Sequence, residues 1–405
     1  MLIIMIQKKL GVAIDIGTTT IALHLVDLNT GKRLSTVSGV NAQSPYGADV
    51  TSRIKYSDQN GHDQLTQLIR NQLSEMIIEA CKQADKQAEN IEYITIAANT
   101  VMQHLAAGYS PVTMGYAPFN TVSLFGEELP VWDDPKSALK EIKNAIIYYT
   151  PAISAYVGGD ITAGLLAAGF EDIKDPAIFL DIGTNGEMVL KHDNIYYCCA
   201  TAAGPAFEGA EITQGMAAEN GAIDHVRLND NKKIEFTTIG GVNPKGLCGS
   251  GLLDTLAILL DMGVVDETGR LLDKDKFYLS EEDNVYITAG DIRKLQLAKA
   301  AIAAGIQVLL HFAGITEADI KTLALAGGFG SYMDLKSAAR IGLFPKSLLP
   351  VAKALGNTAG EGAALAVDSE DVRARLKAIH SQCEYIELSS IAFFNDKFVD
   401  EMAFE

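Results

Sequence analysis

Two stretches of this sequence, Asp15-Ile16-Gly17-Thr18-Thr19 and Asp181-Ile182-Gly183-Thr184-Asn185, follow one pattern. Each ends an apolar run that predicts a β-strand. An aspartate at a strand end, followed by glycine and small hydroxyl residues, predicts a tight turn whose backbone N–H groups hold phosphate oxygens while the carboxylate faces a hydrated cation or a water. One copy alone also fits an ordinary hairpin turn. Two copies after equivalent strands predict duplicated halves that face each other across a cleft.

The size and charge of the chain restrict its class. Its 405 residues, 48% of them hydrophobic, predict two domains or one large bilobal unit. A formal charge of -18, from 33 Lys and Arg against 51 Asp and Glu, disfavours nucleic acid or an anionic membrane as the main partner. An anionic ligand then requires local neutralisation by backbone amides, a metal ion or a few cations. Polar residues interrupt the apolar runs, which argues against a transmembrane span.

The start and the cysteines indicate a cytoplasmic protein with reduced thiols. The segment Met1–Leu10 continues into the first strand without a small-residue cleavage site, which argues against a secretory signal. Five cysteines are scattered without a C-x-x-C pair or ferredoxin-like spacing. Cys198 and Cys199 are adjacent in a predicted strand and point to opposite faces, so they are poor joint ligands. No iron–sulfur cluster is expected in this chain.

The order of segments predicts a mixed α/β chain with a repeated plan. Three short strands around the first turn precede a long helical stretch, 62–87, and the strand pattern recurs around the second turn. Small residues dominate 151–169 and 358–367, which predicts two helices that pack very close to another backbone. We expect a first lobe at 1–156, completed by the C-terminal helices, and a second lobe at 157–405.

Two acidic turns, two small-residue helices and the loop Gly327-Gly328-Phe329-Gly330 together resemble the actin-like ATPase (ASKHA) superfamily. The resemblance implies a duplicated, ribonuclease H-like α/β fold with two lobes around a nucleotide cleft. In that fold the two turns grip the phosphates and the Gly-Gly loop passes close to adenosine. The cofactors implied are ATP and Mg²⁺.

A closer resemblance covers nearly the whole chain. The segments that carry it are 41–50, 98–105, 181–187, 203–209, 246–251, 297–302 and 325–332. They resemble the reductive activators of corrinoid proteins, which use ATP to drive cob(II)alamin in a methyltransferase system back to cob(I)alamin. The resemblance implies a corrinoid protein as partner and a homodimer as assembly.

The start of the chain departs from that family. Its members usually carry an N-terminal [2Fe–2S] domain, whereas Met1 here lies only a short way before Asp15. We expect a separate ferredoxin-like protein to supply the electron. A shortened form of a longer chain, or an ATP-dependent role without a redox centre, also fits.

The resemblance assigns roles to individual residues. Asp15 and Asp181 are implied to position Mg²⁺ through waters, as metal-binding and catalytic groups. The turn residues implied to donate to phosphate oxygens are Gly17, Thr18, Thr19, Gly183, Thr184, Asn185 and Gly186. Gly327, Gly328 and Phe329 are implied to line the adenosine side, although Phe329 also fits a core position.

Five further residues have open alternatives. Asp160 fits an acid near the metal and the attacking water, or an N-cap. Glu208 fits a group that faces the phosphates or the corrinoid partner, or a surface carboxylate. Gln296 and Lys299 lie three apart on one helix face and fit nucleotide contacts, or a lysine whose stem packs on the core. His104 is predicted to be structural rather than a cobalt ligand.

Three other functions compete. A small-molecule kinase of the same superfamily needs a catalytic base and a substrate pocket, for which the sequence shows no motif. An ATP-gated chaperone for corrinoid-protein assembly predicts tight partner binding without reduction. Activators of acyl-CoA dehydratases hold a [4Fe–4S] cluster between subunits through cysteines, a role open in principle to Cys198 or Cys248.

Overall fold

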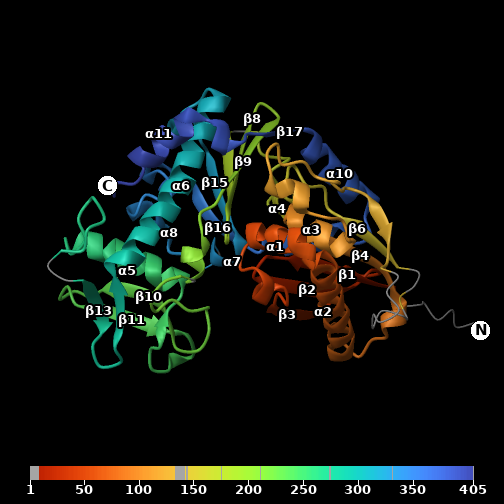
Figure 1. Ribbon diagram of the computed structural model, residues 1–405, viewed down its shortest axis with the longest axis horizontal. Helices are drawn as coiled ribbons and strands as arrows, with labels where there is room; N and C mark the ends of the chain where they lie inside the picture. The colour runs from red at the N-terminus through yellow and green to blue at the C-terminus, as the bar shows by residue number, and fades with distance from the viewer. Residues whose placement is uncertain are drawn as a thin grey trace, which may run out of the picture. The chain divides into compact units, whose positions relative to one another are not determined.

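The computed structural model of the protein describes residues 9–132, 142, 145–174, 176–209, 211–272, 275–330 and 332–404. The chain divides into two compact units (Figure 1). Unit 1 comprises Met1–Asp172 and Asn357–Cys383, and unit 2 comprises Ile173–Gly356 and Glu384–Glu405. The division falls after Asp172 rather than at the expected 156/157, because the first small-residue helix packs with unit 1.

Unit 1 is built on a six-stranded sheet of order β3-β2-β1-β4-β6-β5. Strands β1, β2 and β3 form the antiparallel meander that the sequence predicts, and β4 and β6 add in parallel. The strand bounds are β1 Leu10–Ile16, β2 Thr20–Asp27, β3 Lys32–Val40, β4 Ile91–Ala98, β5 Glu128–Pro130 and β6 Ile146–Tyr149. The parallel register places Ile16 at the end of β1 beside Ala98 at the end of β4, so the segments after both strands leave the same edge of the sheet.

The helices of unit 1 follow the apolar periodicity of the sequence. Their bounds are α1 Val50–Tyr56, α2 His62–Gln83, α3 Thr100–Ala107, α4 Gly159–Ala167, α9 Thr358–Ala366 and α10 Glu370–Ser381. Helix α2 buries Leu65, Ile69, Leu73 and Ile77 at four-residue spacing against the sheet. The segment Ser57–Gly61, which is kinked at Gln59 and Asn60, joins α1 to α2.

Helices α4 and α9 pack against each other at very short range, as their small residues predict. A Cβ atom on Gly362 of α9 would lie 2.1 Å from the carbonyl oxygen of Ala163 on α4. Ala163 and Ala363 share a small apolar cluster with Ala13 of β1 and Ala97 of β4. The two helices therefore lie close to β1, which leads into the first turn, and to its neighbour β4.

Unit 2 repeats the strand plan of unit 1. Its main sheet has the order β16-β15-β7-β8-β9-β17, with β7, β8 and β9 antiparallel and β15 and β16 parallel to β7. The bounds are β7 Ala177–Ile182, β8 Gly186–His192, β9 Ile195–Thr201, β15 Thr322–Ala326, β16 Ala352–Gly356 and β17 Cys383–Tyr385. Strands β7, β8, β9, β15 and β16 thus correspond to β1, β2, β3, β4 and β6, which confirms the duplication.

Two smaller sheets and, among its described residues, five α-helices complete unit 2. The strands are β10 Ala222–Leu228, β11 Ile234–Thr238, β12 Gly246–Leu247, β13 Lys276–Ser280 and β14 Val285–Thr288. The helices are α5 Gly249–Asp261, α6 Ala289–Ala313, α7 Gly327–Gly330, α8 Leu335–Arg340 and α11 Ala392–Asp400. Within the described ranges only α6 is long and apolar enough to cross a membrane, and 78% of its most apolar window is buried inside the structure. Helix α6 therefore serves as a core helix of unit 2.

Candidate functional site

The first turn, Asp15–Thr19, is a hairpin that requires glycine. The backbone N–H of Gly17 donates to the carbonyl oxygen of Thr20 at 2.9 Å. A Cβ atom on Gly17 would lie 2.6 Å from that same oxygen, closer than van der Waals contact permits. Glycine at position 17 therefore lets the chain reverse directly after β1.

Three successive carbonyl oxygens of the first turn accept hydrogen bonds from outside it. The oxygen of Gly17 accepts from Asn41 Nδ2 at 2.9 Å, and that of Thr19 accepts from the backbone N–H of Asn41 at 2.9 Å. The oxygen of Thr18 accepts from Arg53 Nη2 at 2.5 Å. These supports fix the turn from the side of its carbonyl groups.

A further support holds a side chain of the turn. Asn99 caps α3 with its Oδ1, which accepts from the Met102 N–H at 3.0 Å. Its Nδ2 donates to Thr18 Oγ1 at 3.0 Å. Because β1 and β4 are parallel neighbours, the start of α3 lies beside the first turn.

Asp15 is a half-buried carboxylate at the end of β1. Its Oδ2 accepts from Asn357 Nδ2 at 2.8 Å, and Asn357 also caps α9 through the Gly360 N–H. Burial raises the pKa of Asp15 to about 6, and the hydrogen bond from Asn357 opposes that rise. The carboxylate therefore changes charge close to neutral pH, and a nearby cation would favour its ionised form.

Asp160 lies in the first turn of α4. The N-cap of this helix is Gly158, so Asp160 does not have the capping role that was its alternative. Its Oδ1 accepts from the Ile161 N–H at 2.9 Å, and its negative charge at a helix N-terminus is favourable.

The second turn, Asp181–Gly186, brings Glu208 to its side. The N–H of Gly183 donates to the carbonyl oxygen of Asn185 at 2.9 Å. The buried hydroxyl of Thr184 lies 3.2 and 3.1 Å from the two carboxylate oxygens of Glu208. Glu208 ends the short 3-10 helix Pro205–Glu208, so the segment that follows β9 returns to the turn between β7 and β8.

The Gly-Gly loop passes directly against Asp181. Parallel pairing of β15 with β7 sets Ala326 beside Asp181. Gly327 has φ +90°, and a Cβ atom there would lie 2.6 Å from Asp181 Oδ1. Phe329 stacks on the buried ring of Phe207 with centroids 5.3 Å apart and packs against the core of unit 2. The structure thus joins Gly327 to the second turn and gives Phe329 the core contact that was its alternative.

Gln296 and Lys299 hold the C-terminal segment 402–404. Both side chains are buried on α6. Gln296 Nε2 donates to the carbonyl oxygen of Met402 at 2.5 Å, and Lys299 Nζ donates to that of Ala403 at 2.6 Å. The ammonium of Lys299 also lies 5.2 Å from the ring centroid of Phe404. These contacts are structural, and a role of either residue toward a nucleotide stays a prediction.

His104 has the structural role expected of it. Its Nδ1 lies 2.7 Å from the carbonyl oxygen of Thr100, and its Nε2 accepts from the Val122 N–H at 3.2 Å. Burial lowers the pKa of His104 to about 4, so the ring is neutral at pH 7. Both nitrogens are engaged, which leaves none for a metal.

The described residues contain no group of three or more His, Cys, Asp and Glu side chains arranged to hold a metal ion. Mg²⁺ commonly binds through one or two carboxylates together with substrate phosphates and waters. The role of Asp15 and of Asp181 toward such an ion stays a prediction.

The five cysteines are free thiols, and four of them, Cys81, Cys198, Cys199 and Cys248, are buried. Burial raises the pKa of Cys81 to about 11 and that of Cys199 further. A cluster held between subunits needs surface thiolates, so the burial of Cys198 and Cys248 disfavours that competing function.

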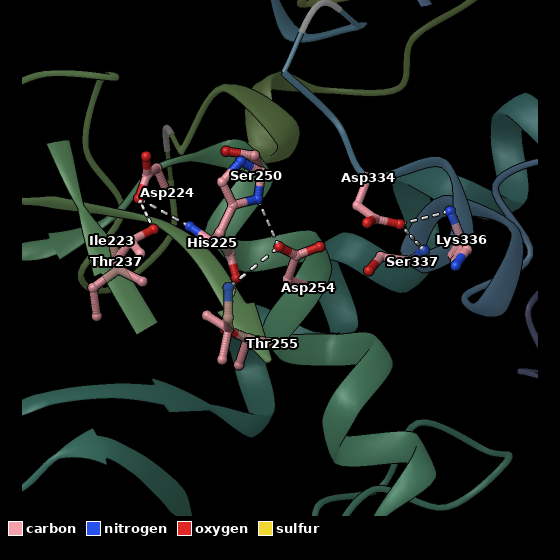
Figure 2. A network of polar contacts seen from close by, with 12 residues as sticks. Ile223, Asp224, His225, Thr237, Ser250, Asp254, Thr255, Asp334, Lys336 and Ser337 are labelled. Atoms are coloured by element: carbon pink, nitrogen blue, oxygen red, sulfur yellow. Dashed lines mark hydrogen bonds and ion pairs between the residues drawn. The ribbon is translucent and has the colours of Figure 1, made fainter. Parts of the chain in front are cut away.

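A separate polar network in unit 2 joins β10, α5 and α8 (Figure 2). The carboxylate of Asp254 lies between His225 and Ser337 and is buried. Its Oδ2 lies 3.1 Å from His225 Nδ1 and accepts from the Val226 N–H at 3.2 Å. Burial raises the pKa of Asp254, and its hydrogen bonds oppose the rise. This network fastens α5 to the small sheet.

Sequence reasoning missed four residues that shape the first turn: Asn41, Arg53, Asn99 and Asn357. Asn41 and Asn99 lie in segments that carried the family resemblance, which was the available signal. Arg53 and Asn357 gave no such signal. A charged residue within a helix is ordinarily exposed, and a polar residue just before a helix is ordinarily only its cap.

Comparison with known proteins gives two family matches that together span nearly all of the described chain. Residues 175–405 match the C-terminal domain of RACo, the ASKHA domain. Residues 10–173 match the RACo middle region.

Individual relatives agree with the family matches. The chain is 34% identical over 422 residues to the corrinoid activation enzyme RamQ of Eubacterium limosum, covering 96% of this chain and 69% of the relative. It is 27% identical over 362 residues to the [Co(II) methylated amine-specific corrinoid protein] reductase of Methanosarcina barkeri, covering 83% and 66%.

A solved structure described as a reductive activator for corrinoid, iron-sulfur protein superposes with a TM-score of 0.88 at 36% identity. It covers 98% of this chain and 66% of the other. The expected actin-like fold and the expected family are both confirmed. The chain therefore belongs to the RACo family of reductive activators of corrinoid proteins, of which it holds the middle region and the C-terminal ASKHA domain.

Proposed function

We propose that this chain is the ATPase part of an activator that drives a corrinoid protein from cob(II)alamin to cob(I)alamin. The observation that carries the proposal is the duplicated strand plan in which β1 and β7, at equivalent places in their sheets, lead into Asp15–Thr19 and Asp181–Gly186. Relatives named for corrinoid activation and corrinoid-protein reduction support the choice of substrate. One electron from a separate ferredoxin-like donor reduces Co(II) to Co(I).

We assign both turns to the phosphates of ATP. Backbone N–H groups of Thr18–Thr19 and Thr184–Gly186 would donate to phosphate oxygens, whereas those of Gly17 and Gly183 are engaged within their own turns. Asp15 and Asp181 would hold Mg²⁺ through waters, and the ion supplies charge neutralisation to the phosphates. Gly327 contributes by leaving room for the Asp181 carboxylate.

We assign to Glu208 the role of orienting the attacking water. Its carboxylate is fixed at the second turn by Thr184, and a carboxylate held beside a phosphate site can accept a proton from water. Asp160, at the start of α4, is the second acid that we assign to this chemistry.

Coupling requires two nucleotide states with different affinities for the corrinoid protein. Reduction of Co(II) is difficult while an axial ligand stabilises that oxidation state. Binding energy that removes the ligand raises the reduction potential of Co(II), and the ATP state must favour that arrangement over the ADP state.

We place the reaction in the cytoplasm. We expect the assembly to be a homodimer, which sedimentation analysis would test.

The test is an anaerobic assay with the full chain, candidate corrinoid proteins, a low-potential reductant and ATP. The proposal predicts the absorbance of cob(I)alamin only when both ATP and the chain are present. Glu208→Gln should abolish it, whereas the same change at Glu282, an exposed residue of the β13–β14 turn, should not. ATP-independent reduction would contradict the proposal.

A further inference from the structure

Arg53 is a fully buried guanidinium whose hydrogen bonds all go to neutral groups. Its Nε donates to the carbonyl oxygen of Gly47 at 3.0 Å, and its Nη1 donates to Gln43 Oε1 at 3.2 Å and to Met102 Sδ at 3.1 Å. Its Nη2 donates to the carbonyl oxygen of Thr18 at 2.5 Å. Helix α1 supplies the residue, and its side chain is 0% exposed.

The charge of Arg53 has no ion-pair partner within the described chain. By contrast, Arg373, which is also buried, contacts the carboxylate of Glu128. The carboxylate of Asp49 interacts electrostatically with Arg53, but it caps α1 by accepting a hydrogen bond from the Ser52 N–H. Burial lowers the pKa of Arg53 to about 10, which leaves it charged at pH 7. A buried charge without a counter-charge is unfavourable unless something else compensates it.

The position of Arg53 indicates what that compensation is. The Thr18 carbonyl belongs to the same peptide group as the Thr19 N–H, so a charged donor on the oxygen polarises the N–H at the other end. Asn41 Nδ2 acts in the same way on the peptide that joins Gly17 to Thr18. The Thr18 N–H itself has no hydrogen-bond partner among the described residues. Positive potential is thus directed at the N–H side of the first turn.

We propose that Arg53 is a positioning residue whose buried charge, acting through the Thr18–Thr19 peptide, sets the affinity of the first turn for the phosphates of a nucleoside polyphosphate. The negative charge of the ligand in turn compensates the guanidinium. This inference rests on the assignment of the turn to ATP and adds a residue to it. Discrimination of ATP over adenosine then depends on Arg53, although Arg53 touches the turn rather than the ligand.

The alternative is that Arg53 only fastens α1 to the sheet. Removal of a structural anchor weakens the binding of all nucleotides alike. Removal of a positive charge that acts on the phosphates weakens the binding of each ligand in proportion to the negative charge of that ligand. The affinity ratio of ATP to adenosine, measured without Mg²⁺ so that only protein groups neutralise the phosphates, separates the two.

The experiment compares Arg53→Gln and Arg53→Lys with a matched control, Arg373→Gln, which removes another buried arginine of unit 1 whose charge is paired. Calorimetric titration with ATP, ADP and adenosine should show Arg53→Gln losing ATP affinity by about tenfold or more, ADP less and adenosine little. Arg53→Lys keeps the charge and should keep the ratio. Arg373→Gln should leave the ratio unchanged.

Equal loss of ATP and adenosine affinity in Arg53→Gln would overturn the inference. If Arg53→Gln does not fold, Arg53→Lys decides, since a collapsed ratio in the variant that retains the charge contradicts the proposal and a retained ratio supports it. A wild-type chain that binds no ATP would overturn the proposed function itself. ATP binding by the wild type with an unchanged ratio in Arg53→Gln overturns only the role of Arg53.

Discussion

Asn357 donates a hydrogen bond from Nδ2 to Asp15 Oδ2 at 2.8 Å and thereby joins two residues that are 342 positions apart. The same asparagine caps α9 with its Oδ1, which accepts from the Gly360 N–H at 2.9 Å. One side chain therefore fixes both the start of a helix and the carboxylate of the first turn. The C-terminal part of the chain takes part in setting the charge state of Asp15.

Asn357→Ala should raise the pKa of Asp15 above about 6, because the hydrogen bond that favours the ionised carboxylate is lost. Loss of the cap should cost about 0.5–2 kcal/mol of unfolding free energy. Ser369→Ala, which removes the cap of α10, is the control for stability alone. Carboxyl NMR titration gives the pKa, and an unchanged value in Asn357→Ala would show that the contact does not act on Asp15.

The affinity for Mg²⁺–ATP should fall as pH decreases through about 6, because protonation of Asp15 removes a charge that attracts the cation. In the ligand-free protein the linkage has the opposite sense. A folded-state pKa above the ordinary 3.8 contributes stability at low pH that is lost as pH rises through about 6. Asp15→Asn should flatten both profiles, measured by calorimetry and by urea unfolding. Profiles identical to the wild type would exclude Asp15 as their source.

Gly327→Ala should displace the Asp181 carboxylate or the loop, since the new Cβ would lie 2.6 Å from Oδ1 and the residue has φ +90°. We expect a loss of about 1–3 kcal/mol in unfolding free energy together with weaker ATP binding. Gly290→Ala is the matched control, because its Cβ would meet only Thr288 Oγ1 at an ordinary 3.6 Å. Equal stability and ATP affinity in the two variants would be incompatible with the close approach of Gly327 to Asp181.

Stability should decline as pH falls from about 6.5 towards about 4, because burial keeps His104 neutral while the unfolded chain takes up the proton. The full effect is of the order of 3 kcal/mol, from a shift between those two pKa values. His104→Gln removes the titrating group and should flatten this part of the curve in chemical unfolding. A slope that survives the substitution would have to arise elsewhere.

The parts of the site that follow local patterns could be predicted from the sequence. Asp15 and Asp181, each followed by glycine and threonine, locate the turns because strand ends and tight turns are set by a few neighbouring residues. Gly362 beside Ala163 confirms the close helix packing that small residues predict.

Other contacts could not be predicted, because they depend on tertiary approach. Asn357 meets Asp15, and Arg53 meets Thr18, only once distant elements have packed. The three-residue spacing of Gln296 and Lys299 correctly indicates a shared face, but it does not reveal that 402–404 lies against that face.

In the proposed function, ATP consumed at the two turns drives reduction of a corrinoid protein. The most direct measurement follows phosphate release and cob(I)alamin absorbance together in one anaerobic mixture with limiting ATP and excess reductant. We expect both signals to rise together, to stop when ATP is exhausted and to disappear in Asp181→Asn. Cob(I)alamin that forms at the same rate without ATP, or phosphate release that proceeds with no cob(I)alamin, would contradict it.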